Sequence, residues 1–270
     1  MRDIATKTTT SYILEKYHLQ ALKKLGQNFL IDKNIIEKII ASSNIDKFTA
    51  VIEIGPGIGA MTQQLMKHAG LVQCYEIDER LKPVYNDFLN YENVSITFQD
   101  FLTINLKEIV TQLKLDYEKV MIVANVPYYI TTNIIEKVII EKAPIDSMVI
   151  MIQKEVAEKL ISDYKNPLTL TLQDIGQVSY EFSVSKHVFI PRPHIDSAVV
   201  KIQFYSTYDE QLYQLLKDAF KQRRKTIYNN LKHYPNIKDI LTISNIPFNK
   251  RSEELTLRDF KTIKKNLFHI

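Results

Sequence analysis

Short apolar runs alternate with amphipathic segments through most of this chain. Buried strands are predicted where five apolar runs lie, at 51–54, 71–77, 94–98, 120–124 and 148–152. Helical spacing of apolar residues between them predicts helices over 60–69 and 131–140. The segments 182–188 and 198–204 predict an antiparallel hairpin that closes the sheet. Strands alternating with helices indicate a doubly wound α/β fold, with a mostly parallel sheet of seven strands.

Two flanking regions have different patterns. Residues 1–25 are polar and rich in Thr and Lys, which predicts a basic amino-terminal arm that is partly helical. Asp32 is the expected N-cap of a helix, because Ile35, Ile36, Ile39 and Ile40 follow it at helical spacing. From 205 onward the spacing is helical, so we expect a domain over 1–204 and a small all-α domain over 205–270. The Thr-rich segment 168–172 fits either a strand or a helix.

Composition narrows the class of protein. At 270 residues, with 45% hydrophobic and 24% charged residues, the chain is long enough for one large or two modest globular domains. The single cysteine, Cys74, excludes an internal disulfide framework and a cysteine-based zinc site, and the six histidines are scattered. We therefore expect no metal. No signal peptide or membrane-spanning stretch is evident, so we expect a cytoplasmic protein, and by default a monomer.

The charge is unevenly distributed. Residues 205–270 contain 13 Lys and Arg against 7 Asp and Glu, a net of +6, whereas residues 1–204 have a net of −2. A near-neutral body joined to a basic domain is typical of an enzyme that binds a polyanion, although a solvated lysine-rich helical domain has the same balance.

A glycine-rich turn follows the first strand. The pattern Glu53-x-Gly55-x-Gly57-x-Gly59 lies between a strand and a helix, as in α/β nucleotide-binding units. Glu76 ends the next strand, where a carboxylate suits a ribose diol, and Asp100 ends the third, where it can accept from an adenine amine. A dinucleotide oxidoreductase shares part of this pattern. Pro56 removes a donor that pyrophosphate would use, so S-adenosylmethionine, with adenine and ribose but no phosphate, fits better.

The fourth strand ends in Asn125-Val126-Pro127-Tyr128. The Asn125 side-chain carbonyl and the backbone carbonyl of Val126 or Pro127 can each accept one hydrogen from an exocyclic amine, and Tyr128 can stack on the ring. Holding both hydrogens localises the nitrogen lone pair and aims it at an electrophile. Asn and Pro are also ordinary turn residues, so the motif alone is equally compatible with a simple strand-to-loop turn.

Together these motifs resemble the ribosomal RNA adenine N6-dimethyltransferase family, over nearly the whole chain. The matching segments are 24–32, the glycine turn 53–59, Glu76 with Asp78, Asp100, 125–128, the loop 189–200, and 219–226 with 229–231. The resemblance implies a Rossmann-like class I methyltransferase fold and cofactor contacts at Gln27, Asn28, Leu30, Gly55, Gly57, Glu76, Asp100 and Asn125.

The resemblance also implies roles for the remaining site residues. Asn125, Pro127 and Tyr128 form the catalytic turn, with Phe189 stacking on the adenine opposite Tyr128. The basic residues Lys221, Arg223, Arg224 and Lys225 are expected to bind RNA phosphates, which positions the RNA without specifying its sequence. One departure lies at 162–167, which is shorter than the family's loop and lacks its glycine, so the substrate side of the site is expected to be altered.

The implied reaction transfers methyl groups from S-adenosylmethionine to N6 of two adjacent adenosines in the hairpin loop near the 3′ end of 16S rRNA, within the 30S subunit or its precursor. It leaves S-adenosylhomocysteine and N6,N6-dimethyladenosines and serves ribosome biogenesis. The alternative within the family is the 23S rRNA enzyme of the macrolide-resistance type. A non-enzymatic RNA-binding assembly factor is disfavoured by the intact Glu76, Asp100, Asn125 and Tyr128. A protein-glutamine methyltransferase would not need the basic carboxyl-terminal domain.

Overall fold

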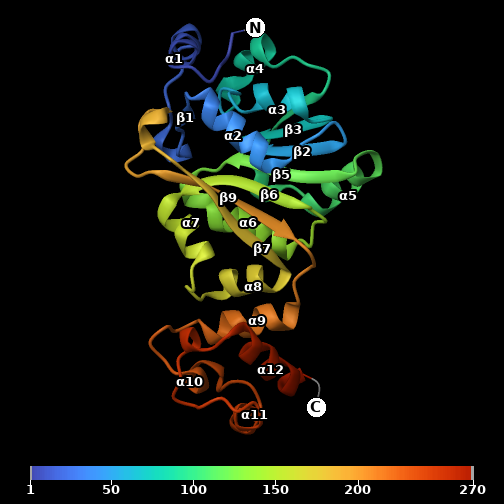
Figure 1. The fold of residues 1–270 in the computed structure, drawn as a ribbon, viewed down its shortest axis with the longest axis vertical. Coiled ribbons are helices and arrows are strands. Elements are labelled where there is room, and N and C mark those ends of the chain that lie inside the picture. Colours follow the sequence, from blue (N-terminus) through green and yellow to red (C-terminus); the bar gives the residue numbers. More distant parts are fainter. Residues whose placement is uncertain (1, 269–270) are drawn as a thin grey trace. The chain divides into compact units, whose positions relative to one another are not determined.

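The structure is a computed structural model that describes residues 2–268 (Figure 1). It divides into two compact units. The first comprises residues 1–158 and 178–204, and the second comprises 159–177 and 205–270. The chain therefore passes from one unit to the other three times.

The first unit is built on a seven-stranded sheet with the order β4-β3-β2-β5-β6-β9-β7. Neighbours from β4 to β6 are parallel, and β9 runs antiparallel to β6. The strands are β2 (Thr49–Ile54), β3 (Leu71–Glu76), β4 (Val94–Phe98), β5 (Lys119–Asn125), β6 (Ser147–Gln153), β7 (Gly176–Val184) and β9 (Ser197–Phe204). Six of the seven predicted strands lie where they were expected, and the seventh, expected over 182–188, is β7, which begins and ends earlier and is followed by a 3₁₀ turn at Lys186–Val188. The predicted fold class is confirmed.

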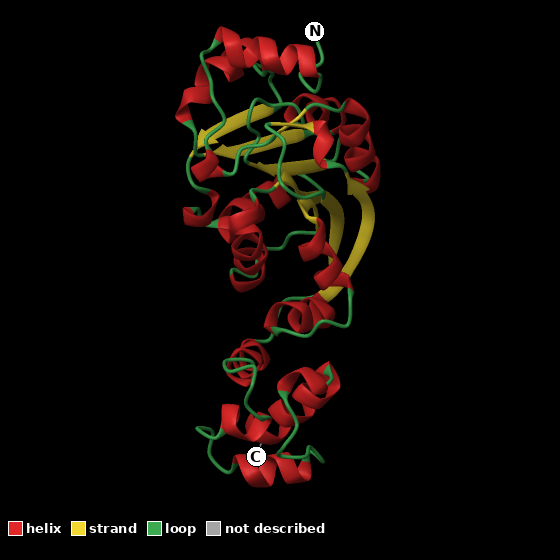
Figure 2. Ribbon diagram, turned by 90° about the vertical axis from the view of Figure 1, so that its left-hand side faces the viewer, coloured by secondary structure: helices red, strands yellow, loops and turns green. Residues whose placement is uncertain are grey.

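Helices connect and cover the strands of this unit, as Figure 2 shows. They are α1 (Lys7–Lys16), α2 (Lys33–Ser43), α3 (Thr62–His68), α4 (Lys82–Phe88), α5 (Leu106–Asp116), α6 (Thr131–Ile140) and α7 (Lys154–Ile161). Single 3₁₀ turns lie between them: η1 (Lys23–Leu25), η2 (Glu79–Leu81), η3 (Phe101–Thr103), η4 (Tyr128–Ile130) and η5 (Lys186–Val188). Asp32 caps α2 as predicted, because its Oδ1 accepts from the amides of Asn34 (2.9 Å) and Ile35 (3.3 Å).

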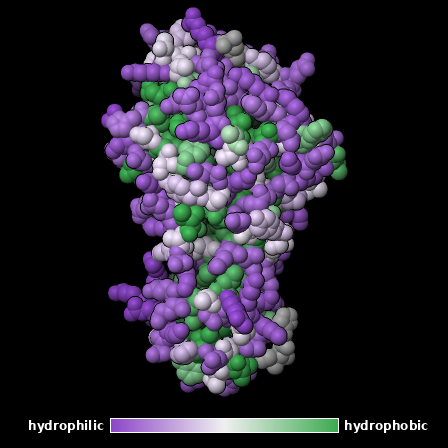
Figure 3. Space-filling view, in the orientation of Figure 1, coloured by the Kyte–Doolittle hydropathy of each residue, from purple (hydrophilic) through white to green (hydrophobic). Residues whose placement is uncertain are grey.

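The central strands are mostly apolar because both sheet faces are covered. Every residue of β2 is buried, as are the six residues from Ser147 to Ile152 in β6. The predicted basic arm takes part in this core, since Ile4 and Ile13 are fully buried. The Ile4 amide donates to Gln63 Oε1 (2.9 Å), and Gln63 Nε2 donates to the Arg2 carbonyl (3.0 Å). Hydrophilic side chains cover most of the face in Figure 3, with smaller hydrophobic patches between them.

A two-stranded sheet joins segments far apart in the sequence. Its strands are β1 (Phe29–Leu30) and β8 (Phe189–Ile190), which pair antiparallel with Leu30 opposite Phe189. No strand is predicted from the sequence at 29–30. A two-residue strand has no recognisable alternation, so this pairing could not be predicted from local pattern.

The second unit is helical. It contains α8 (Pro167–Ile175), α9 (Glu210–Ala219), α10 (Ile227–Leu231), α11 (Ile237–Ile243), η6 (Ser252–Glu254) and α12 (Leu257–Phe268). Leu170 of α8 packs into one apolar core with Leu212, Leu215 and Phe260. Residues 159–177 therefore belong with the helical unit rather than with the catalytic domain, which corrects the boundary expected from sequence.

A partly buried lysine connects α6 to the loop that follows β4. Lys137 Nζ donates to the carbonyls of Leu102 (3.2 Å) and Ile104 (2.7 Å), and pairs with Glu141. Glu141 Oε2 in turn accepts from the Leu106 amide at the start of α5 (2.7 Å). One ion pair thus satisfies backbone groups from two other elements.

We predict that Lys137→Met destabilises the fold by about 2–3 kcal/mol, because it leaves two carbonyls without their donor and the Glu141 carboxylate without its cation. Lys154→Met is the matched control. Lys154 also pairs with a glutamate four residues later, but at 4.0 Å and with its side chain 45% exposed. Such a pair contributes under about 0.5 kcal/mol. Urea unfolding of both variants measures the difference, and equal losses would contradict the assignment.

Candidate active site

One pocket lies where the parallel strands β2, β3, β4 and β5 end. Because parallel strands point the same way, their carboxyl ends meet at one edge of the sheet, where ligands of α/β folds bind. The lining contains every residue predicted to bind the cofactor: Gln27, Asn28, Leu30, Gly55, Gly57, Glu76, Asp100 and Asn125. Pro127 and Tyr128 of the predicted catalytic turn also line it.

Glu76 is buried at the end of β3 and held by several donors. Its Oε1 accepts from the amides of Ile77 (2.8 Å) and Asp78 (2.9 Å), and its Oε2 accepts from the Gly57 amide (3.1 Å). Burial raises the pKa of this carboxyl, while the amide donors oppose the rise. These bonds fix the carboxylate beside the glycine turn.

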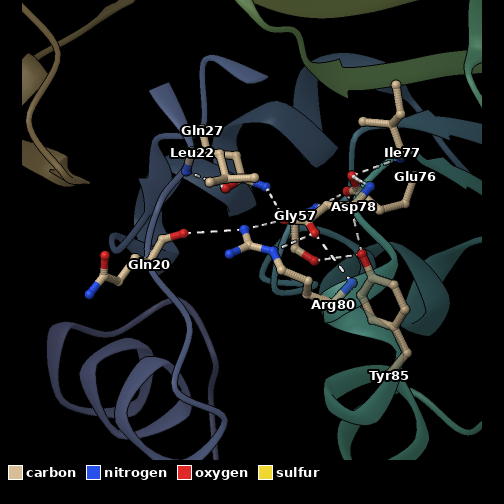
Figure 4. A network of polar contacts seen from close by, with 9 residues as sticks. All are labelled: Gln20, Leu22, Gln27, Gly57, Glu76, Ile77, Asp78, Arg80 and Tyr85. Atoms are coloured by element: carbon tan, nitrogen blue, oxygen red, sulfur yellow. Dashed lines mark hydrogen bonds and ion pairs between the residues drawn. The ribbon is translucent and has the colours of Figure 1, made fainter. Parts of the chain in front are cut away.

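A clasp around Asp78 holds the segment before β1 against the end of β3 (Figure 4). Gln27 Nε2 donates to Asp78 Oδ2 (2.8 Å), and Gln27 Oε1 accepts from the Leu22 amide (2.8 Å). Arg80 donates Nε to Asp78 Oδ1 (2.8 Å) and a terminal nitrogen to Oδ2 (2.6 Å), and it also reaches the Gln20 carbonyl (3.2 Å). The Arg80 guanidinium holds the pKa of the Asp78 carboxyl below its usual value.

The side chain of Asn125 has a defined orientation. Its Nδ2 donates to the backbone carbonyl of Asn28 (3.3 Å), so its Oδ1 is left as an acceptor. No residue among 2–268 donates to that oxygen. The Pro127 carbonyl already accepts from the Ile130 amide (3.1 Å), whereas within the same range no donor reaches the Val126 carbonyl. The two available acceptors are therefore Asn125 Oδ1 and the Val126 carbonyl.

Two further pocket residues are positioned by their own hydrogen bonds. The Tyr128 hydroxyl lies 2.7 Å from Ser197 Oγ on β9, and burial raises its pKa. Asp100 Oδ1 accepts from the Leu102 amide (2.9 Å) and so caps η3. The contact with Ser197 thereby fixes the Tyr128 side chain, and the contact with the Leu102 amide fixes Asp100.

Glu53 is a pocket residue to which the sequence analysis assigned no function. It is 1% exposed on β2; its Oε2 accepts from Thr62 Oγ1 (2.6 Å), and its Oε1 has no partner among the described residues. Burial raises the pKa of this carboxyl to about 7. An acidic residue directly before a glycine turn was the signal that could have identified it, because its carboxylate must face the turn or the ligand.

Phe189 does not line the pocket. It is 3% exposed within the core, where β8 pairs with β1. Its stacking on the adenine opposite Tyr128 stays a prediction. Its backbone instead helps to hold Leu30, which does line the pocket.

The predicted RNA-binding residues lie in the second unit. Lys221, Arg223, Arg224 and Lys225 are all exposed. They occupy a turn between α9 and α10 rather than a helix, since Thr226 caps α10 by accepting from the Asn229 amide (3.3 Å).

Within 2–268, no group of three or more His, Cys, Asp or Glu could hold a metal ion. Over the same range, no helix is both long and apolar enough to span a membrane.

Comparison with known proteins gives close relatives over nearly the full chain. Residues 18–267 match the family described as Ribosomal RNA adenine dimethylase. A Ribosomal RNA small subunit methyltransferase A from Bacillus pumilus is 40% identical over 285 residues, covering 98% of each chain. A protein of the same name from Staphylococcus aureus is 44% identical over 278 residues, covering 96% of this chain and 94% of its own.

Solved structures share the fold. A dimethyladenosine transferase from Plasmodium falciparum is 26% identical with a TM-score of 0.69, covering 87% of this chain and 95% of its own. The 23S rRNA methyltransferase ErmE is 24% identical with a TM-score of 0.66, covering 89% and 99%. At that identity the second likeness concerns the fold alone.

The buried Glu53 generates a pH prediction. Its pKa rises from 4.5 to about 7 on folding, so between these values the folded chain keeps a proton that the unfolded chain has lost. The free energy of unfolding of the ligand-free protein should therefore fall as pH rises through this window, by on the order of 3 kcal/mol. Glu53→Gln should remove most of that fall.

Urea unfolding of wild type and Glu53→Gln at about pH 5 and about pH 8 provides the measurement. Glu37→Gln, at an exposed position of α2, is the control and should keep the wild-type pH dependence. The same pH dependence in wild type and Glu53→Gln would show that Glu53 is not the titrating group.

Proposed function

This chain belongs to the ribosomal RNA adenine dimethylase family, and we propose that its substrate is the pair of adjacent adenosines in the hairpin loop near the 3′ end of 16S rRNA. The enzyme is an S-adenosylmethionine-dependent rRNA adenine dimethyltransferase. Its relatives at 40% and 44% identity are both named as small-subunit enzymes, which supports 16S over the 23S alternative. Each adenosine would receive two methyl groups on N6.

The pocket suits S-adenosylmethionine because its buried charges are negative. Glu53 presents an unpartnered buried oxygen, and Glu76 presents a second carboxylate, while the ligand has a sulfonium and an ammonium. We assign the ribose diol to Glu76, the adenine amine to Asp100 and the amino acid end to the turn containing Gly55 and Gly57. When bound, the cofactor supplies the methyl group on a sulfur that is already activated as a leaving group.

The observation on which the proposal rests is the orientation of Asn125. Its amide nitrogen is engaged by the Asn28 carbonyl, so Oδ1 points an acceptor into the pocket beside the free Val126 carbonyl. Two acceptors at this turn match the two hydrogens of one exocyclic amine. Binding both hydrogens keeps the nitrogen lone pair out of conjugation with the ring and directs it toward the electrophile.

Tyr128 provides the surface on which the target ring rests. The bond between its hydroxyl and Ser197 holds the phenol ring in one orientation, which lowers the entropy lost on stacking. Stacking of a base on an aromatic ring contributes about 1–3 kcal/mol, which offsets the few kcal/mol needed to extract the base from its stack. The methylated nitrogen is strongly acidic, so the turn needs acceptors rather than a dedicated base.

We further propose that the enzyme acts as a monomer in the cytoplasm, on the 30S subunit or its precursor, and that it needs no metal. The exposed Lys221–Lys225 turn of the second unit is assigned to RNA phosphates. A turn suits this role because its side chains radiate in several directions and can follow a curved backbone.

We predict that Asn125→Ala lowers kcat for methyl transfer to unmethylated 30S particles by about 10²–10³-fold, the loss typical of removing one preorganised polar group. Labelled S-adenosylmethionine provides the measurement, with the label located in N6,N6-dimethyladenosine near the 16S 3′ end. Asn105→Ala, which removes an exposed cap of α5, is the control and should keep full activity.

Particles of the 50S subunit are assayed in parallel. Label found only in 50S rRNA would show that the enzyme methylates 23S rRNA, which is the alternative substrate. Full activity of Asn125→Ala on 30S particles would remove the turn from the mechanism while leaving the substrate assignment intact.

We predict that replacing Lys221, Arg223, Arg224 and Lys225 together by Ala weakens binding to 30S particles uniformly and flattens the salt dependence. Each lost phosphate contact should reduce the slope of log K against log[salt] by about 0.7–0.9. Filter binding at several salt concentrations measures the slope. Lys38 on α2 is an exposed lysine outside the cluster, and Lys38→Ala should leave the slope unchanged. An unchanged slope in the fourfold variant would contradict the assignment of the cluster to RNA phosphates.

A further inference from the structure

Tyr129 is an aromatic residue at the pocket to which no role has been assigned so far. It directly follows Tyr128, lines the pocket and is 60% exposed. Within residues 2–268 its hydroxyl makes no hydrogen bond. An aromatic ring this exposed adds little to the core, so packing does not explain its presence at the mouth of the site.

The two adjacent tyrosines point in different directions. Both lie in η4 (Tyr128–Ile130), a 3₁₀ turn, where successive side chains diverge by about 120°. Tyr128 reaches Ser197 on β9, whereas Tyr129 lies against Gly26 on the amino-terminal segment. The rings therefore flank the catalytic turn on two sides and cannot hold the same base.

The Tyr129 ring packs against Gly26, which has no side chain. The glycine has φ +61°, and a Cβ there would lie 3.4 Å from both Pro127 Cβ and Tyr129 Cε1. The edge of the ring thus packs over bare backbone. Because the Asp78 clasp holds this segment in place through Gln27, the neighbouring residue in sequence, the ring has a fixed support while most of its surface stays open.

Two exposed lysines lie two and three residues before Gly26 in the sequence. Lys23 and Lys24 form most of η1 (Lys23–Leu25), directly before that glycine. Within 2–268, neither side chain has a hydrogen bond or ion pair. An open aromatic surface next to uncompensated positive charge is the combination that binds an unpaired nucleotide, with the base stacked and the phosphate neutralised.

We propose that Tyr129, with Lys23 and Lys24, forms a subsite for the nucleotide adjacent to the adenosine held on Tyr128. This rests on the proposed function, because it requires an RNA strand entering the pocket. While one adenosine occupies the pocket, its neighbour stays covalently attached and must lie at the mouth. Stacking that neighbour on Tyr129 fixes which adenosine enters, without contact to the methyl donor.

The test compares Tyr129→Leu with Tyr129→Phe on unmethylated 30S particles. Stacking needs the ring and not the hydroxyl, so Tyr129→Leu should raise KM for the particle about tenfold, and Tyr129→Phe should stay within about twofold of wild type. In both variants kcat at saturating particle and the Kd for S-adenosylmethionine, measured by calorimetry, should match wild type. Tyr12→Leu, at a 47% exposed tyrosine outside the pocket, is the matched control and should change nothing.

An unchanged KM in Tyr129→Leu would overturn the subsite while leaving the proposed function intact. A rise in KM that is accompanied by weaker binding of S-adenosylmethionine would also overturn the subsite and leave the proposed function intact. Equal KM rises in the Leu and Phe variants would assign the effect to the hydroxyl and also overturn the stacking role. Absence of transfer by wild type would instead refute the proposed substrate and, with it, the subsite. In the double variant Lys23→Ala/Lys24→Ala, a flatter salt dependence of KM would support the contact between these lysines and a phosphate. An unchanged salt dependence would show that the lysines make no such contact.

Discussion

The site depends on one carboxylate outside the reacting centre. Asp78 binds Gln27 and Arg80, and Gln27 also binds the Leu22 amide, so the segment before β1 is held against the end of β3. That segment places the Asn28 carbonyl where it accepts from Asn125 Nδ2. The orientation of the Asn125 amide therefore depends on a contact made two residues after Glu76, in the loop that follows β3. Preorganisation of this kind lowers the barrier because the polar groups need not reorient during the reaction.

A second constraint is the negative charge buried in the pocket. Glu53 and Glu76 lie on adjacent strands, and Glu76 adds to the raised pKa of Glu53 after burial itself. Two buried carboxylates cost stability unless a cation neutralises them. A cationic ligand therefore gains affinity from relieving this cost, while a pyrophosphate would be repelled. The same charges that weaken the empty protein select a sulfonium donor over a dinucleotide.

The parallel sheet, the glycine turn and the carboxylates at the strand ends could be predicted because each depends on local pattern. The Asp78 clasp could not, since Gln27 and Asp78 are 51 residues apart and neither local motif indicates that the two side chains meet. The burial of Phe189 could not be predicted for the same reason: the β1–β8 pairing that buries it is set by long-range register. The starts of two helices are also marked by local capping residues. Asn166 before Pro167 marks the start of α8, and Thr226 marks α10, so the basic cluster had to precede that helix.

Recognition of two adjacent adenosines requires contacts outside the pocket. Both adenosines present the same amine to Asn125 and the same ring face to Tyr128, so these groups distinguish adenine from other bases but not one adenosine from its neighbour. Phosphate contacts of the kind proposed for the Lys221–Lys225 turn repeat along the strand and define position only coarsely. Register must then come from a contact next to the pocket that a single nucleotide can fill. On the described surface of the first unit, the open ring of Tyr129 meets that requirement, because it lines the pocket one residue from Tyr128, to which we assign the target base.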